Sequence, residues 1–234
     1  MSSGWGNLRR MASATVEDYL KQILLEQQEA GGARVSTGRI AQALAVTPGT
    51  VTSMLKTLAD GNLVDYEAYG GVRLTEAGRR LALHVVRRHR LVELFLVKIL
   101  GFDWSEVHDE AERLEHAVSE RVIERMDEML GHPSVDPHGD PIPTASLALP
   151  AEEPDLLTLA AGKVGGRYRV ARIAEQSPDF LRLVEKIGLR PGRKVRLVAI
   201  DDAADTIEVE LDSRPARRAS LGLRAAAKIL LERI

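Results

Sequence analysis

The sequence predicts a mainly α chain that ends in a small β domain, because the spacing of its apolar residues changes along the chain. Apolar residues recur at helical spacing up to about residue 130 and alternate with polar residues after residue 165. Ahead of these, two short helical segments joined by a tight turn precede a glycine-tipped hairpin, an order typical of a winged helix-turn-helix. We therefore expect a first domain over 1–75, a helical domain over 76–145, a linker over 146–164 and a β domain over 165–234.

The helices of the first domain are predicted from their capping residues. A helix over 15–29 is followed by a short helix whose N-cap is Ser36 or Thr37. Thr47 is a second N-cap, and Pro48 suits the first position of the helix that follows it. Two strand-like runs joined by a pair of glycines then complete the motif as its wing.

Charge is distributed unevenly, and the basic part coincides with the helix-turn-helix. Residues 31–100 carry ten Lys and Arg against five Asp and Glu, whereas residues 101–160 carry three against fifteen. Basic residues attract phosphate, and in this motif the start of the second helix meets base edges in the major groove. The predicted partner is double-stranded operator DNA. The residues predicted to meet base edges are Thr47, Gly49, Thr50, Thr52 and Ser53, with Lys56 one turn further on as a DNA contact, and Arg34, Arg39 and Arg73 are candidate phosphate contacts.

Two helices after the wing, over about 76–100 and 105–130, carry possible metal ligands. His89 and Glu93 lie four residues apart on the first and therefore share a face. The stripe on the second consists of His108, Glu112, Glu115 and His116. Nitrogen and oxygen donors without sulfur suit six-coordinate Mn²⁺ or Fe²⁺ better than tetrahedral zinc, in one or two sites. The isolated His84, His132 and His138 are expected to be packed or surface residues.

Less helix is predicted for residues 131–234 than for the part of the chain before them. The stretch 131–164 holds many of the prolines and is interpreted as a linker. Beyond it, strands are expected near 167–175, 194–200 and 206–211, with a short helix near 178–188. The tail, GLRAAAKILLERI, is expected to be helix-like.

Composition excludes several classes of protein. The chain has no cysteine, which excludes disulfide bonds and thiolate metal sites. No apolar run approaches the roughly 20 residues of a membrane helix, and the first ten residues lack the apolar core of a secretory signal. We therefore expect a cytoplasmic protein without a membrane partner.

At this point the sequence resembles the diphtheria toxin repressor family, which includes iron-dependent and manganese-dependent regulators. The matching segments, from about residue 12 to the end, are VEDYL, LAVTPGTVTSML, RRHRLVELFL, EVHDEAERLEHAVSE and HPSVDPHGDPIP. The resemblance implies a winged helix-turn-helix, a helical domain for dimerisation and metal binding, and a C-terminal SH3-like barrel. It also implies a metal-dependent repressor of metal-ion homeostasis that acts as a homodimer and is not an enzyme.

The resemblance further implies two metal sites per chain. One would use His89, Glu93 and His108, to which the SH3-like domain adds a Glu and a Gln in longer family members; Glu175 and Gln176 are the nearest matches here. The other site would use Asp18, Glu112, Glu115 and His116. Asp18 and Glu112 stand where iron-type members have methionine and cysteine, so the set is closer to the manganese type.

The dimer that the resemblance implies needs an apolar surface. The face of helix 105–130, together with Phe95, Leu96, Leu100 and Trp104, is a candidate interface, although the same residues would equally suit an intramolecular core.

Two other functions are compatible with the residues. The first is a winged-helix repressor that responds to an organic ligand, in which the stripe of His and Glu residues would have only a structural role. A metal-dependent enzyme would use the same cluster to activate water, but the chain lacks the paired Glu-x-x-His motifs of a diiron bundle and shows no P-loop or dinucleotide fingerprint.

Overall fold

The computed structural model describes residues 13–149, 155–213 and 215–234, which form two compact units. The first unit comprises the described part of Met1–His89 together with Pro143–Ala148, and the second comprises Arg90–Ile142 and the described part of Leu149–Ile234. The first ten residues, which lack the apolar core of a secretory signal, lie outside the described residues. Of the helices in the described ranges, none is long and apolar enough to cross a membrane.

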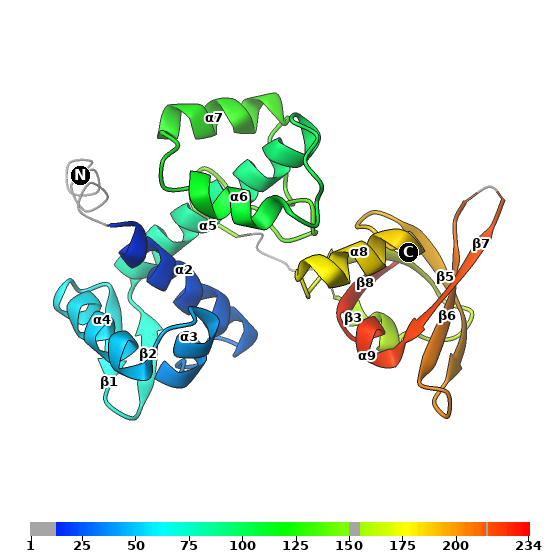
Figure 1. Ribbon diagram of the computed structural model, residues 1–234, viewed down its shortest axis with the longest axis horizontal. Helices are drawn as coiled ribbons and strands as arrows, with labels where there is room; N and C mark the ends of the chain where they lie inside the picture. The colour runs from blue at the N-terminus through cyan, green and yellow to red at the C-terminus, as the bar shows by residue number, and fades with distance from the viewer. Residues whose placement is uncertain (1–12, 150–154, 214) are drawn as a thin grey trace. The chain divides into compact units, whose positions relative to one another are not determined.

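The first unit contains the predicted winged helix-turn-helix (Figure 1). Its elements are α2 (Ala14–Glu29), α3 (Thr37–Ala43), α4 (Pro48–Asp60), β1 (Val64–Glu67) and β2 (Gly71–Leu74). Both predicted caps are present: the Ser36 hydroxyl accepts from the Arg39 amide, and the Thr47 hydroxyl accepts from the Thr50 amide. The apolar faces of the three helices meet in a core whose fully buried members include Leu20, Ile23, Ile40, Leu55 and Leu58.

The wing is a two-stranded antiparallel hairpin, with Val64 paired to Leu74 and Glu67 paired to Gly71. It is attached to the segment before α3 by a backbone bridge between Val35 and Val72. Gly71 has a φ of 89°, and a Cβ at this position would lie 2.6 Å from the Val35 carbonyl oxygen. Glycine is therefore required where the wing meets the helices.

A long helix, α5 (Glu76–Lys98), leaves the wing and runs from the first unit into the second. In the second unit it is followed by α6 (Val107–Leu114) and α7 (Glu120–Met129). The single helix predicted over 105–130 is wrong, because Ser119 has extended backbone angles and begins a new helix. Serine is favoured at helix N-termini over helix interiors, but the Ser119 hydroxyl makes no capping hydrogen bond to α7.

The residues of the candidate dimer surface differ in burial, because some are core residues and others are exposed. Leu96 belongs to a core between α5, α6 and α7, and Trp104 is 3% exposed within the core of the C-terminal sheet domain. Both are therefore core residues, whereas Leu100 is 57% exposed. Ile99 and Phe102 beside it are also exposed.

The segment after α7 is folded rather than an open linker up to residue 142. Asp136 and His138 are buried, and Ile142 packs in the helical core. The Ile173 amide donates to the His138 carbonyl oxygen at 2.9 Å, so strand β4 (Arg167–Ile173) lies against this segment. The proline content suggested a linker, but these prolines shape a packed loop.

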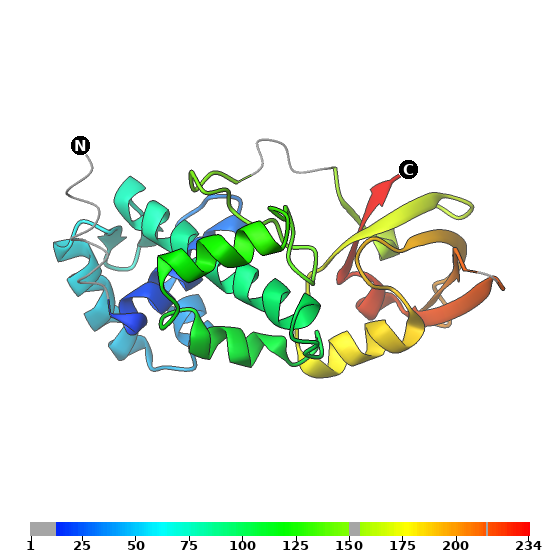
Figure 2. The ribbon, with the colours of Figure 1, turned by 90° about the horizontal axis from the view of Figure 1, so that it is seen from above.

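The C-terminal domain is one antiparallel sheet with the strand order β3-β8-β4-β5-β6-β7. The other strands are β3 (Leu157–Thr158), β5 (Lys194–Asp201), β6 (Thr206–Leu211), β7 (Arg217–Gly222) and β8 (Ile229–Arg233). Helix α8 (Pro178–Ile187) packs on the sheet through Leu181 and Val184 (Figure 2). The domain also holds two short helical turns, η1 (Leu159–Ala161) and α9 (Leu223–Ala226).

Part of this domain differs from the prediction. The tail is not a helix beyond α9, because its last residues form β8 between β3 and β4. Alternating burial of Ile229 and Leu231 fits a strand better than a helix. Strand β7, which begins with two arginines, was not predicted, and β3 lies within the range expected to be linker.

Candidate metal centre

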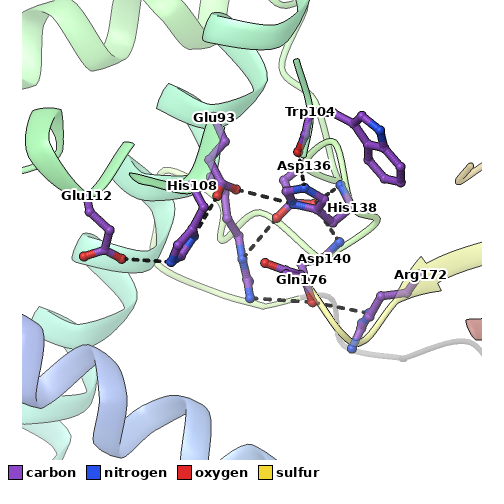
Figure 3. Close-up of polar contacts among 10 residues, drawn as sticks. Glu93, Trp104, His108, Glu112, Asp136, His138, Asp140, Arg172 and Gln176 are labelled. Atoms are coloured by element: carbon purple, nitrogen blue, oxygen red, sulfur yellow. Dashed lines mark hydrogen bonds and ion pairs between the residues drawn. The ribbon is translucent and has the colours of Figure 1, made fainter. Parts of the chain in front are cut away.

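The predicted stripe of ligands begins on α5, where His89 and Glu93 lie one turn apart. In the second unit, Glu93 Oε1 lies 3.2 Å from His108 Nδ1, and His108 Nε2 lies 3.5 Å from Glu112 Oε1 (Figure 3). The Glu93 side chain is 1% exposed, whereas that of His108 is 47% exposed. Helices α5 and α6 thus bring the predicted carboxylate and imidazole together at a site that is buried at one end and reachable from solvent at the other.

The stripe continues past the end of α6. Glu115 follows Leu114, the last residue of that helix, and keeps helical backbone angles. The Glu115 side chain is fully buried, and its Oε1 lies 3.4 Å from His116 Nε2. Asp18, the fourth ligand that the resemblance implies, is half-buried on α2 in the other unit.

The structure adds two residues that the sequence analysis did not assign as ligands. Asp136 and His138 each offer an atom that lies, with one from Glu93, in a group whose members are all within 4.8 Å of one another. The three side chains are buried, and they come from α5 and the loop after α7 (Figure 3). His138 is therefore a packed residue, as expected, but it is packed among potential metal ligands.

The hydrogen bonds of His138 fix which ring nitrogen is available. Its Nε2 lies 2.9 Å from the Trp104 carbonyl oxygen, which only accepts, so Nε2 carries the proton. In the neutral ring Nδ1 then has a lone pair, and among the described residues this buried atom has no hydrogen-bond partner. It lies 3.9 Å from Glu93 Oε2. An imidazole held by a carbonyl at one nitrogen and left open at the other is the usual arrangement of a histidine metal ligand.

The environment of Asp136 disfavours the charged form of its carboxyl group. Burial raises the pKa of its carboxyl well above the ordinary value, and the charges of Asp140 and Glu93 raise this pKa further, while Arg90 lowers it. Its Oδ1 accepts from the amides of His138 and Asp140 at 2.8 and 2.9 Å. The Arg90 guanidinium is 3.8 Å from its other oxygen. A cation beside Glu93 and Asp136 would offset this cost, so the donor set fits a divalent metal.

The sequence contained a signal for these residues. Asp136, His138 and Asp140 alternate in the segment DPHGDP, and an alternation of acid and imidazole is unusual for a linker. The proline content of the segment obscured that signal.

The two candidate ligands from the C-terminal domain have other partners. Glu175 pairs with Lys228 at 3.1 Å, and hydrogen bonds from Lys228 and Ser177 lower the pKa of its carboxyl. Gln176 Nε2 donates to Asp140 Oδ2 at 2.5 Å, and Arg172 Nε is 3.5 Å from Asp140 Oδ1. Gln176 therefore contacts the ligand-bearing loop through Asp140 (Figure 3).

The predicted DNA contacts all belong to the first unit. Thr47, Gly49, Thr50, Ser53 and Lys56 are exposed along the start of α4, and Thr52 is half-buried. The three candidate phosphate contacts have partners within the unit, each an acidic residue. Arg34 pairs with Asp65 and Glu67, Arg39 pairs with Glu26 and Glu29, and Arg73 pairs with Asp65.

Three family models match successive parts of the chain. Residues 11–72 match the iron dependent repressor N-terminal DNA binding domain, and residues 75–144 match the iron dependent repressor metal binding and dimerisation domain. Residues 157–233 match the FeoA domain.

The curated relatives are transcriptional regulators. The regulator MntR of Bacillus pumilus is 39% identical over 120 residues, which cover 51% of this chain and 81% of the relative. The iron-dependent repressor IdeR of Mycobacterium tuberculosis is 39% identical over 129 residues, which cover 55% of each protein.

Solved structures match nearly the whole chain. A manganese-dependent transcriptional repressor in complex with manganese is 42% identical, with a TM-score of 0.82, over 94% of this chain and 100% of that one. ScaR with bound Cd²⁺ is 36% identical, with a TM-score of 0.74, over 94% and 99%. Together with the helix-turn-helix and the ligand stripe, these matches confirm the resemblance found in the sequence. The chain belongs to the diphtheria toxin repressor family of metal-dependent, DNA-binding transcriptional repressors, which are not enzymes.

Proposed function

We propose that this repressor is activated by Mn²⁺, with Fe²⁺ as the alternative ion, bound at two sites per chain in a homodimer on operator DNA. The donor set supports this choice of ion, because it consists of carboxylates and imidazoles in a chain without cysteine. The relatives named for manganese, which match nearly the whole chain, support it as well.

The first proposed site consists of Asp18, Glu112, Glu115 and His116. Glu115 and His116 already lie side by side, and the Glu115 carboxylate is fully removed from solvent. Glu112 lies one turn earlier and is half-buried. Asp18 lies on α2 of the winged helix-turn-helix unit, and the other three members belong to the second unit.

The second proposed site is centred on Glu93. One of its oxygens faces His108 and the other faces His138. His89 lies one turn before Glu93 on α5, and Asp136 belongs to the same group of potential ligands as Glu93 and His138. The observation that carries this assignment is the buried His138 Nδ1, which has a lone pair and no hydrogen-bond partner among the described residues. We include Asp136 and His138 in this site, and we assign Gln176 to positioning the loop through Asp140. Glu175 remains a weaker candidate ligand because Lys228 holds it.

The chain's own residues suggest how ligand binding would control DNA binding. A bound divalent cation supplies the positive charge that the buried carboxylates need. Asp18 lies on α2, whose apolar face packs in the core of the winged helix, so holding Asp18 holds the recognition helix. The two recognition helices of a dimer must lie about 34 Å apart to enter successive major grooves. The repressor is then active because its DNA-ready arrangement binds the cation better than its other arrangements do.

The proposal is tested by measuring operator binding with each metal. An operator is first selected by the protein itself from a random duplex library in the presence of Mn²⁺. Binding is then measured at one salt concentration with Mn²⁺, Fe²⁺, Zn²⁺ or chelator. We expect Mn²⁺ to raise the affinity about 5- to 150-fold, a typical range for coupling between two sites, and chelator to reverse the gain. An operator affinity that neither metal nor chelator changes would instead favour a repressor that responds to an organic ligand.

A further inference from the structure

A pocket of about 430 Å³ lies between the recognition helix α4 and the wing. It is distinct from the metal centre and is formed entirely within the first unit. Its wall on the helix side includes Thr52 and Lys56, and its opposite wall is the end of the hairpin. The lining residues are Arg34, Ser36, Thr37, Thr52, Lys56, Tyr66, Ala68, Tyr69, Gly70 and Gly71.

The lining of this pocket suits an anion. It contains two cationic side chains and five hydroxyl groups, and no carboxylate. The acidic residues of the wing are neutralised beside it: Arg34 holds Asp65 and Glu67 at 2.7 Å each, and Arg73 holds Asp65 at 3.0 Å. These contacts also keep the pKa of the Asp65 carboxyl below its ordinary value. The pocket therefore combines donors with a local excess of positive charge.

The two cations of the pocket have different roles. Arg34 is committed to the wing, since its guanidinium also donates to the carbonyl oxygens of Asp65 and Gly71 at 2.9 and 3.3 Å. It is thus a positioning residue that fixes the wing against the helices. Lys56 is exposed on α4, and within the described ranges it forms no ion pair. Its ammonium group is the cation that remains for a ligand.

Tyrosines form the other side of the opening. Tyr69, at the tip of the wing, has a fully exposed side chain and a φ of 65°. A non-glycine residue in this backbone region is uncommon, and an exposed aromatic side chain beside a DNA-reading helix offers a hydroxyl donor at the surface. Tyr66 lies on β1 and lines the same pocket.

We propose that this pocket binds a phosphodiester group of the DNA backbone, with the Lys56 ammonium group paired to the phosphate and the Tyr69 hydroxyl donating to it. The inference rests on the proposed function, because it requires the recognition helix to sit in the major groove. DNA fits better than a small organic ligand, since seven of the ten lining residues carry a charged or hydroxyl-bearing side chain, whereas small-molecule sites are mostly apolar and enclose their ligand. Two of its lining residues, Thr52 and Lys56, are also among the predicted DNA contacts on α4.

The salt dependence of DNA binding tests the pocket directly. The logarithm of the binding constant falls linearly with the logarithm of salt concentration, with a slope of about 0.9 per phosphate neutralised. With the Mn²⁺-selected operator, we expect Lys56→Gln to reduce this slope by about 0.9 per pocket. Lys56→Arg is expected to retain it. The matched control is Lys163→Gln, which removes the same charge from an exposed position in the C-terminal domain.

A second arm identifies the ligand as a backbone phosphate. Methylphosphonates, which carry no charge, replace the operator phosphates one at a time. At one position per half-site, the substitution should weaken the parent protein and Lys56→Arg but have no effect on Lys56→Gln. Tyr69→Phe should weaken operator binding, because it removes a neutral hydrogen bond to the phosphate at that same position. It should leave the salt slope unchanged.

The outcomes separate this inference from the function on which it rests. If the parent protein binds no duplex with Mn²⁺ present, both the proposed function and the pocket are overturned. If it binds and Lys56→Gln has the parental slope, only the pocket assignment is wrong. A Lys56→Gln defect confined to one base pair, with the slope unchanged, would also overturn it by assigning Lys56 to base recognition.

Discussion

Glu112→Ala is expected to remove the metal dependence of operator binding. Glu112 lies one turn after His108 on α6 and is half-buried, so its removal leaves the helical core intact. In the proposed function its carboxylate holds the first cation together with Glu115, His116 and Asp18. We expect a gain of about 5- to 150-fold with Mn²⁺ in the parent protein, and almost no gain in the variant. The measurement is a Mn²⁺ titration of operator affinity at constant ionic strength.

A matched control removes the same side chain elsewhere. Glu124→Ala changes an exposed glutamate on α7 and should retain the parental response to Mn²⁺. Asp18→Ala should behave like Glu112→Ala, because both remove a carboxylate from the same proposed site. Unchanged metal dependence in Glu112→Ala and Asp18→Ala would show that the site does not control DNA binding by the winged helix-turn-helix.

Asp136→Asn is expected to stabilise the metal-free protein and to weaken its stabilisation by Mn²⁺. The folded state raises the pKa of this carboxyl chiefly through burial. The folded protein thus holds the proton more tightly than the unfolded chain, and ionisation of Asp136 weakens the fold. The free energy of unfolding should therefore fall as the pH rises from the unfolded-state pKa, near 3.8, through the raised folded-state value.

Asparagine keeps the oxygen that accepts from the His138 and Asp140 amides but removes the charge. We expect this variant to lack the Asp136 contribution to the pH dependence and to gain on the order of 1 kcal/mol at neutral pH without metal. Urea unfolding of chelator-treated protein over a series of pH values measures both effects. In excess Mn²⁺ the parent should gain about 2.7 kcal/mol at 100 times the dissociation constant of the ion, and the variant clearly less.

Asp109→Asn is the control for this prediction, since it neutralises an exposed aspartate in the first turn of α6. It should change neither the pH dependence nor the response to Mn²⁺. An Asp136→Asn variant that is less stable without metal, and equally stabilised by Mn²⁺, would contradict the second proposed site.

The winged helix was predictable because its signals are local. Thr47 as N-cap, Pro48 at the first helical position and the glycine pair of the wing each act within a few residues, and each is present in the structure. The break between α6 and α7 lies before Ser119, in a segment whose apolar spacing remains helical, so the spacing did not predict it. The final strand β8 exists because β3 and β4 pair with it from distant parts of the chain, a cause that the tail's own composition does not reveal.

The candidate metal site was likewise predictable only where its residues lie close together in the sequence. His108 and Glu112 share one helix face, so their spacing was enough to place them together. Asp136 and His138 reach Glu93 only through the fold of the loop after α7, which long-range contacts such as that between Ile173 and His138 determine. The pairing of Arg34 with Asp65 and Glu67 likewise depends on how the wing folds back, and the spacing of these residues in the sequence does not reveal it.

If metal and DNA bind to the same arrangement of the chain, the Mn²⁺ affinity measured with operator must differ from that measured without it. Coupling between two binding sites is reciprocal, so DNA must tighten Mn²⁺ binding by the factor with which Mn²⁺ tightens DNA binding. Electron paramagnetic resonance of free Mn²⁺ provides the measurement. We predict equal factors in the parent protein and no tightening in Glu112→Ala. A Mn²⁺ affinity that is the same with and without operator would contradict the account.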